Sequence, residues 1–314
     1  MQLFHTDQFV LPLPTGHRFP MPKYRLLHEQ VLQNGPGIRI LEAPAATEGE
    51  LALAHDPGYI DGVLRGTLST AAQREIGFPW SERMAQRAVR SVGATIAAAR
   101  AALAEGVAAQ TAGGTHHAYS FKGSGYCVFN DVAVAARLMQ AETHRRHKRG
   151  LRVLVIDLDV HQGNGTAAIF RDDESVFTFS MHGARNFPFR KEASDLDVEL
   201  PDGCSDEPYL AALDHALASV AARLADRPPG LAFYLAGADP HEGDRLGRLK
   251  LSSAGLAARD ERVLAWLRAR RIPVALSMAG GYGHDIHTTV AVQLKTLQLA
   301  QAAWADWATG QGSP

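Results

Sequence analysis

Two aspartates and a histidine stand at alternate positions of one short segment, residues 151–165 (LRVLVIDLDVHQGNG). The apolar residues that open it predict a buried parallel strand, and Asp157, Asp159 and His161 follow at its carboxyl end. Alternate residues of an extended chain share a face, so these three side chains can converge on one point. Carboxylates and imidazole suit a divalent metal of the zinc type. The segment alone also admits an aspartate that caps the following helix and a histidine bonded to it.

Three further segments place glycine and a polar side chain just after an apolar run. They are Gly113-Gly114-Thr115-His116-His117, Gly237-Ala238-Asp239 and Gly280-Gly281-Tyr282-Gly283. The carboxyl ends of parallel strands meet at one edge of a sheet, where ligands bind in open α/β folds. Taken singly, these residues could be loop histidines, a turn aspartate and a packed aromatic ring. Four such loops at one edge instead predict an active site.

The residue types predict a metal-assisted hydrolysis. A catalytic zinc site keeps three protein ligands and one open position, and Asp159, His161 and Asp239 supply such a set. The metal would lower the pKa of a water molecule and polarise a substrate carbonyl. Two carboxylates and one imidazole suit either Zn²⁺ or Fe²⁺, so the native metal stays open.

The remaining polar residues predict the proton transfers. His117 is the candidate general base, because histidine titrates near neutral pH, and His116 is its electrostatic partner or proton shuttle. The Tyr282 hydroxyl can donate a hydrogen bond to a developing oxyanion. Asp157 would accept a hydrogen bond from His116 and fix the tautomer of that ring.

The rest of the chain predicts the frame that positions these residues. Strands are expected at 38–41, 107–110, 153–156, 176–180, 231–236 and 274–278, and helices near 81–105, 130–147, 206–226, 253–270 and 287–308. Ser81 and Ser205 are expected to cap helix N-termini. The alternation predicts an α/β fold, with one domain over residues 1–314 and a mostly parallel central sheet flanked by helices on both faces. Residues 309–314 are expected to be frayed.

Composition excludes several classes of protein. The chain has 314 residues, 46% hydrophobic and 21% charged, with a formal net charge of -1, so a nucleic-acid partner is not expected. The basic run at 145–149 reads as a solvated helix end. Two cysteines, Cys127 and Cys204, fit a reducing compartment better than a disulfide framework. Without a signal sequence or an apolar run of transmembrane length, we expect a cytoplasmic protein with no membrane partner.

Four segments resemble the histone deacetylase family of the arginase–deacetylase superfamily. They are residues 113–130 (GGTHHAYSFKGSGYCVFN), 153–165 (VLVIDLDVHQGNG), 237–249 (GADPHEGDRLGRL) and 279–282 (AGGY), in collinear order. The stretch 242–247 and Asn164 resemble the class IV branch and its bacterial relatives. The resemblance implies an α/β catalytic domain that uses zinc to remove acetyl or longer acyl groups from lysine side chains of a peptide or protein.

The resemblance implies the same site roles as the residue chemistry. Asp159, His161 and Asp239 match the zinc ligands, His116 and His117 the tandem histidines, Tyr282 the carbonyl-polarising tyrosine and Asp157 the partner of the first histidine. It adds Gly125, whose carbonyl would accept the substrate amide N–H, and Tyr126, Phe187 and Leu246 as walls of a narrow tunnel. It also implies a structural K⁺ near Asp157 and Ser180.

The sequence departs from the family pattern at two positions. Asn164 stands where many members have an aspartate beside the second histidine, so the pKa of His117 should be lower than with a carboxylate there. Tyr126 stands where phenylalanine is common, which makes the tunnel slightly more polar. Gly163 lacks the acid that arginase-type sites use for a second manganese, so one metal is expected and ureohydrolysis is not.

Two other functions compete with lysine deacylation. The same chemistry could act on a small molecule such as an acetylated polyamine, although no long insertion narrows the entrance and acidic rim residues would be needed to favour it. A non-catalytic acyl-lysine-binding protein should have lost a ligand, the base or the tyrosine, and none is lost. The oligomeric state is left open.

Overall fold

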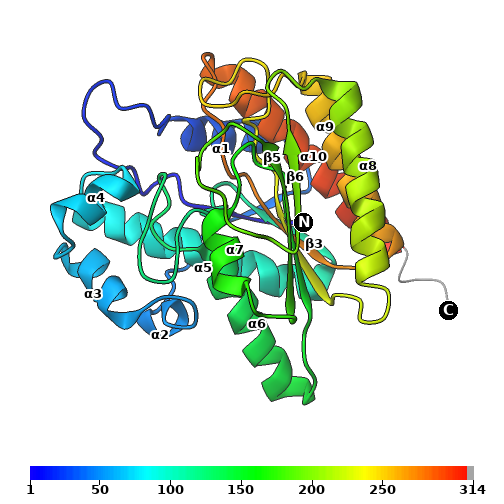
Figure 1. The fold of residues 1–314 in the computed structure, drawn as a ribbon, viewed down its shortest axis with the longest axis horizontal. Helices are drawn as coiled ribbons and strands as arrows, with labels where there is room; N and C mark the ends of the chain where they lie inside the picture. Colours follow the sequence, from blue (N-terminus) through cyan, green and yellow to red (C-terminus); the bar gives the residue numbers. More distant parts are fainter. Residues whose placement is uncertain (310–314) are drawn as a thin grey trace.

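The computed structural model describes residues 1–309, and its centre is an eight-stranded sheet in the order β2-β1-β3-β8-β7-β4-β5-β6 (Figure 1). All the paired strands run parallel. The strands are β1 (Gln2–His5), β2 (Arg39–Glu42), β3 (Val107–Gln110), β4 (Val153–Asp157), β5 (Val176–Gly183), β6 (Leu196–Leu200), β7 (Leu231–Leu235) and β8 (Val274–Ser277). The α/β fold is confirmed, and the sheet is fully parallel within the described residues.

Helices cover both faces of this sheet. They are α1 (Lys23–Asn34), α2 (Glu48–Leu51), α3 (Pro57–Arg65), α4 (Thr70–Ile76), α5 (Glu82–Glu105), α6 (Asp131–His147), α7 (Asn164–Phe170), α8 (Asp206–Arg223), α9 (Ser253–Ala269) and α10 (Ile286–Thr309). Helices α5 and α6 lie on one side, and α8, α9 and α10 lie on the other (Figure 1). Because both faces are covered, β3, β4, β5, β7 and β8 are buried along their whole length, which explains their apolar sequences.

Several elements were not expected from the sequence. Strand β1 has only four residues, and β6 reads LDVEL with most of its side chains partly exposed, so neither carries a long apolar run. Helices α1, α2, α3, α4 and α7 were also missed, and β2 begins one residue later than expected. Among the described residues, no helix is both long and apolar enough to span a bilayer.

One of the two expected helix caps has the expected geometry. The Ser81 side chain accepts a hydrogen bond from the Met84 N–H at 3.1 Å. Ser205 does occupy the N-cap position of α8, but its side chain makes no capping hydrogen bond within the described chain, and the neighbouring Asp206 carboxylate accepts from Ser252. The expected frayed tail begins at the last residue of α10, and 310–314 lie outside the described residues.

Asn130 connects the start of α6 to the loops near the sheet edge. Its Oδ1 accepts from the Ala133 N–H at 3.0 Å, which caps α6. Its Nδ2 donates to the Ala118 carbonyl at 3.1 Å and to the Thr166 hydroxyl at 3.0 Å. The residue is fully buried. One buried amide therefore joins the cap of α6 to the loop of Ala118 and to Thr166 in α7.

Replacing Asn130 with alanine should destabilise the fold more than an ordinary cap deletion. The variant loses the cap and also strands the buried Ala118 carbonyl, so we expect a loss of about 2–3 kcal/mol. Ser81→Ala, the matched cap deletion on α5, should cost about 1 kcal/mol. Urea unfolding followed by circular dichroism measures both, and equal losses in the two variants would contradict this role of Asn130.

Candidate active site

Asp159, His161 and Asp239 come together at the carboxyl ends of two adjacent strands. Asp159 and His161 follow β4, and Asp239 follows β7, which pairs with β4. His161 Nδ1 lies 3.0 Å from Asp159 Oδ1 and 3.2 Å from Asp239 Oδ2. One ligand atom from each residue fits within 4.8 Å of the others, and all three residues are buried. Two oxygens and one nitrogen thus converge as the sequence predicts.

The hydrogen bonds of these carboxylates leave one oxygen without a donor. Asp159 Oδ2 accepts from the Gly280 N–H at 2.7 Å, and Asp239 Oδ1 accepts from the Val160 N–H at 2.9 Å. Asp239 Oδ2 is buried and has no hydrogen-bond partner among residues 1–309, since His161 Nδ1 bonds instead to Asp159. A buried, unpartnered carboxylate oxygen is costly unless a cation lies beside it. This donor set fits a divalent zinc or iron ion.

Glycine is required where the backbone passes these carboxylates. A Cβ added to Gly280 would lie 1.9 Å from Asp239 Oδ2 and 2.6 Å from Asp159 Oδ2. Burial and the charge of Asp159 raise the pKa of Asp239 to about 7, a sign of how closely the two acids are held. The glycine-rich segment after β8 therefore lets the main chain approach the pair and donate to it.

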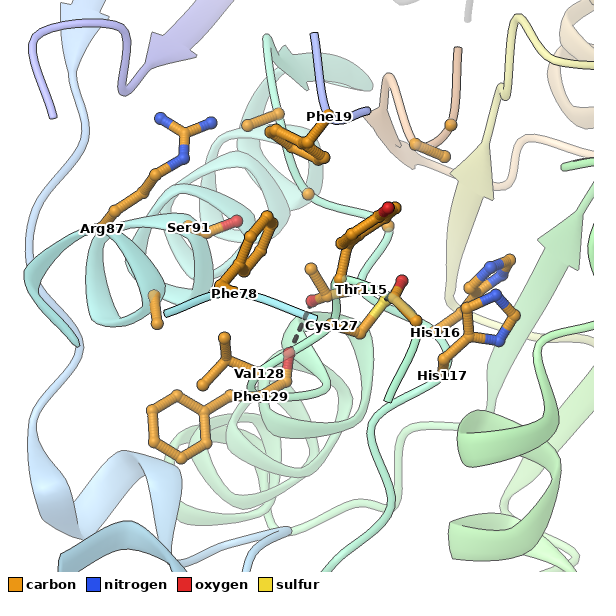
Figure 2. A pocket seen from close by; sticks show the side chains of 18 of the residues that line it. Phe19, Phe78, Arg87, Ser91, Thr115, His116, His117, Cys127, Val128 and Phe129 are labelled. Carbon is orange, nitrogen blue, oxygen red and sulfur yellow. Dashed lines mark hydrogen bonds between the residues drawn. The ribbon is translucent and has the colours of Figure 1, made fainter. Parts of the chain in front are cut away.

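The tandem histidines lie beside this cluster, on the loop after β3 (Figure 2). His116 Nδ1 lies 2.6 Å from Asp157 Oδ2, and His117 Nδ1 lies 2.6 Å from Asn164 Oδ1. The two ring centroids are 4.2 Å apart, and both side chains are buried. Asn164 Nδ2 donates to the Tyr119 hydroxyl at 2.9 Å, which orients the amide so that its oxygen accepts from His117.

The two histidines have opposite protonation tendencies. Burial alone would lower the pKa of His116. The negative charges of Asp157 and Asp159 outweigh this effect of burial and raise the pKa of His116 to about 9. Burial and the positive charges of His116 and His161 lower the pKa of His117 well below its usual value. At neutral pH His117 is therefore an uncharged ring with its Nδ1–H bonded to Asn164, which leaves the Nε2 lone pair available.

Tyr282 is held by its own backbone next to the same cluster. Its N–H donates to Asp244 Oδ2 at 2.6 Å, and its ring centroid lies 6.5 Å from that of His161. Burial raises the pKa of the Tyr282 hydroxyl well above its usual value. The phenol therefore stays protonated and can donate a hydrogen bond.

Two cavities meet at these residues. Both are lined by Gly125, Tyr126, His117, His161 and Tyr282. The outer cavity opens among exposed residues and contains Phe187 and Leu246, two of the predicted tunnel walls. The inner cavity has both polar and apolar walls: Figure 2 shows Phe78, Val128 and Phe129 around it, together with Arg87, Ser91 and Thr115. The residues that line both cavities lie at the junction between the outer cavity and this inner space.

Gly125 and Tyr126 lie at the junction of the two cavities, since both line each of them. Both have positive φ angles, 53° and 67°, and their N–H groups donate to the Glu75 and Ile76 carbonyls at the end of α4. A Cβ on Gly125 would lie 2.8 Å from His117 Cδ2 and 3.0 Å from Phe187, so only glycine fits. The structure therefore brings together all the residues that the sequence predicts for the site.

Two buried aspartates, Asp131 and Asp244, hold the site loops and were not predicted from the sequence. Asp131 accepts from the N–H groups of Gly114 and Thr115 at 3.0 and 2.8 Å. Asp244 accepts from Tyr282 and also from the Leu246 N–H at 2.8 Å. Asp131 follows the cap residue of a predicted helix, and Asp244 lies in a loop, so neither position suggests a buried anchor. Both loops are fixed by side chains outside their own sequence.

Lys23 is a further residue that the sequence did not single out. It is buried on α1, and its Nζ donates to the Gly281 carbonyl at 3.1 Å. The same ammonium lies 5.3 Å from the centroid of the Tyr282 ring, within range of a cation–π contact. Its position at the start of a helix that was not predicted explains why no sequence signal marked it.

Comparisons with known proteins point to one family. The family model for the histone deacetylase domain matches residues 17–297. A protein of Picosynechococcus sp., described as uncharacterised, is 47% identical over 92% of this chain and 94% of its own length. Histone deacetylase 2 of Arabidopsis thaliana is 32% identical over 82% of this chain and 67% of its own. A polyamine deacetylase of Rattus norvegicus is 33% identical over 76% of this chain but only 43% of its own length.

The same fold occurs in solved structures. A histone deacetylase homologue from Aquifex aeolicus superposes with a TM-score of 0.80, at 24% identity, over 96% of this chain and 84% of its own. At that identity the likeness concerns the fold, while the family model and the relatives cover most of the sequence. This chain belongs to the histone deacetylase family.

Proposed function

We propose that this protein is a metal-dependent amidohydrolase that removes acyl groups from lysine side chains of peptides or proteins. The observation that carries the proposal is the grouping of a three-residue ligand set, an uncharged buried histidine and a protonated tyrosine at the junction of two cavities. Family membership supports the hydrolase class, and the residues below account for the reaction.

Asp159, His161 and Asp239 would hold a single Zn²⁺ or Fe²⁺ ion. The bound ion would supply Lewis acidity, which polarises an acyl carbonyl and acidifies a water molecule. Ser180 on β5 is in register with Asp157 on β4, and its hydroxyl lies 2.9 Å from His182 Nδ1. Asp157 and Ser180 are our candidates to help bind a structural K⁺.

The remaining residues handle the protons and the substrate amide. His117 Nε2 takes a proton from the attacking water, because the ring is neutral and its Nδ1 is engaged by Asn164. Tyr282 donates to the carbonyl oxygen as negative charge develops there. The Gly125 carbonyl accepts the substrate amide N–H. Collapse of the tetrahedral species breaks the C–N bond, and the histidine pair returns the proton to the leaving amine.

The inner cavity supports the removal of acyl groups longer than acetyl. Phe78, Val128 and Phe129 give part of it an apolar lining that suits a hydrocarbon chain, although Arg87 and Ser91 line it as well (Figure 2). Tyr126 lies where this space meets the outer cavity, and the outer cavity would take the lysine methylenes between Phe187 and Leu246.

An acylated polyamine is the competing substrate, because one relative of this chain is a polyamine deacetylase of Rattus norvegicus. A polyamine is cationic, so it favours acidic residues near the entrance. The outer cavity is instead lined by Arg18, Arg185, Arg245 and Arg248, with Glu75 as its one acidic lining residue in the described chain. This positive charge favours an acyl-lysine peptide over a cationic polyamine.

The free, buried Cys127 and Cys204 also fit the reducing cytoplasm as the location.

Removing the base or the tyrosine tests the assignment of roles. His117→Ala should lower kcat about 100- to 10,000-fold, because the attacking water loses its proton acceptor. Tyr282→Phe should lower it about 100- to 1,000-fold, because it removes one donor to the oxyanion. The measurement is steady-state hydrolysis of acetyl-lysine and longer acyl-lysine peptides, with circular dichroism as the folding control. Full activity in either folded variant would falsify this mechanism.

Removing one ligand should abolish metal binding. Asp239→Asn should contain far less than one metal per chain by elemental mass spectrometry, and it should lose the thermal stabilisation that added Zn²⁺ or Fe²⁺ gives the wild-type apoprotein. Asp214→Asn, an exposed carboxylate on α8, is the matched control and should bind metal normally. If Asp239→Asn retains one tightly bound ion, the ligand assignment is wrong.

The Asn164 amide sets the pH dependence. The wild-type pKa of His117 is lowered, so the acidic limb of kcat/KM should fall below the usual histidine value of 6.5. In Asn164→Asp, a carboxylate beside the ring favours its protonated form and should raise that pKa by about 1–3 units. Activity should then be lost at a higher pH as the solution is acidified. Asn34→Asp, an exposed site on α1, is the control, and an unmoved limb in Asn164→Asp counts against His117 as the base.

A further inference from the structure

Four arginines surround the mouth of the outer cavity. We call Arg18, Arg185, Arg245 and Arg248 the arginine rim; all four are exposed and line the same cavity as His117 and Tyr282. Glu75 is the one acidic lining residue within the described chain, and its carboxylate is paired with Lys122 at 2.5 Å. The mouth therefore carries excess positive charge, in a chain whose formal net charge is only -1.

Two of these arginines have no carboxylate to neutralise them. Arg185 and Arg248 both approach Asp202, at 4.0 and 3.1 Å. Arg18 and Arg245 make no ion pair with any acidic residue of the described chain. These two are therefore the members of the rim with charge available for a ligand.

Arg245 is also held in a fixed position. Its Nε donates to the Tyr282 carbonyl at 2.8 Å, and one Nη2 hydrogen bond goes to the Arg18 carbonyl at 3.1 Å. Main-chain oxygens thus orient the guanidinium, while its Nη1 has no hydrogen-bond partner among the described residues. A guanidinium fixed before binding loses less entropy when it pairs with a carboxylate. Its attachment to Tyr282 also links the rim directly to the tyrosine of the site.

We propose that the arginine rim is a carboxylate-binding subsite that selects acyl-lysine substrates with an anionic group next to the acylated residue. The inference rests on the proposed deacylase function. When the lysine side chain fills the tunnel, its backbone and flanking residues lie at the mouth, within reach of Arg18 and Arg245. The carboxylate can be the side chain of a flanking aspartate or glutamate, or the α-carboxylate of a carboxyl-terminal acyl-lysine.

Matched peptides test the subsite. One set places Asp, Asn or Lys beside the same acyl-lysine, and a second set ends at the acyl-lysine as a free acid or an amide. We expect kcat/KM for the Asp peptide to exceed that for the Asn peptide about tenfold, with the Lys peptide lowest. The preference should shrink as salt rises from about 50 to 500 mM, because the charges are at the surface. Comparing the two sets shows which carboxylate the rim uses.

Variants connect the preference to the residues. Arg18→Gln and Arg245→Gln should each reduce the Asp-to-Asn ratio of kcat/KM, and the double variant should bring it close to one. The ratio is the readout, since Arg245 also contacts the Tyr282 loop and its loss can change absolute rates. Arg145→Gln, an exposed arginine at the far end of α6, is the matched control and should keep the wild-type ratio.

The outcomes separate the subsite from the reaction itself. If the metal-loaded protein hydrolyses the peptides with equal kcat/KM for Asp, Asn and Lys, the subsite is wrong and the deacylase function stands. A wild-type ratio in the double variant also overturns the assignment to these arginines. If no acyl-lysine peptide is hydrolysed at all, the proposed function fails and the subsite fails with it.

Discussion

The site depends on holding two carboxylates, Asp159 and Asp239, side by side out of contact with water. Burial and the charge of Asp159 raise the pKa of Asp239, whereas the neighbouring His116 and His161 outweigh burial at Asp159 and hold its pKa below the usual value. Two backbone N–H groups, from Val160 and Gly280, offset part of the cost of burying the pair, and a bound cation would offset more. Gly280 must be glycine to deliver its N–H so closely. The main chain after β8 therefore passes close to the two carboxylates because it donates a hydrogen bond to one of them.

The same electrostatic arrangement gives two adjacent histidines different properties. His116 faces the carboxylate of Asp157, while His117 faces the neutral amide of Asn164. The cationic ring of His116, 4.2 Å away, then helps to keep His117 uncharged. The difference between the two partners, a carboxylate and an amide, therefore separates the pKa values of two buried histidines.

The ends of the central strands were predictable, because apolar runs followed by glycine and a polar residue carry their own local signal. The two aspartates that hold the site loops in place were not predictable. Asp131 and Asp244 hold the loops through hydrogen bonds to distant backbone, and nothing in their neighbouring residues marks them as buried. Strand β1 is short and β6 is partly exposed, so neither has the pattern of an interior strand. The sequence did not reveal the tertiary contacts through which a buried charged residue holds a distant loop in place.

The amino-terminal segment, residues 6–24, illustrates that limit and joins the two ends of the site. Phe19 lines the inner cavity (Figure 2), where the buried Arg87 donates to the Thr6 carbonyl of the same segment. Arg18, one residue before Phe19, belongs to the arginine rim, and its main-chain carbonyl accepts a hydrogen bond from Arg245. Lys23 donates a hydrogen bond to the Gly281 carbonyl, in the loop of Tyr282. A single stretch of chain therefore contacts the inner cavity, the loop of Tyr282 and the mouth of the outer cavity. In the function proposed above, acyl-chain length would be selected in the inner cavity and charge at the mouth. The two selections would then act on different parts of a substrate, yet both would depend on the packing of this one segment.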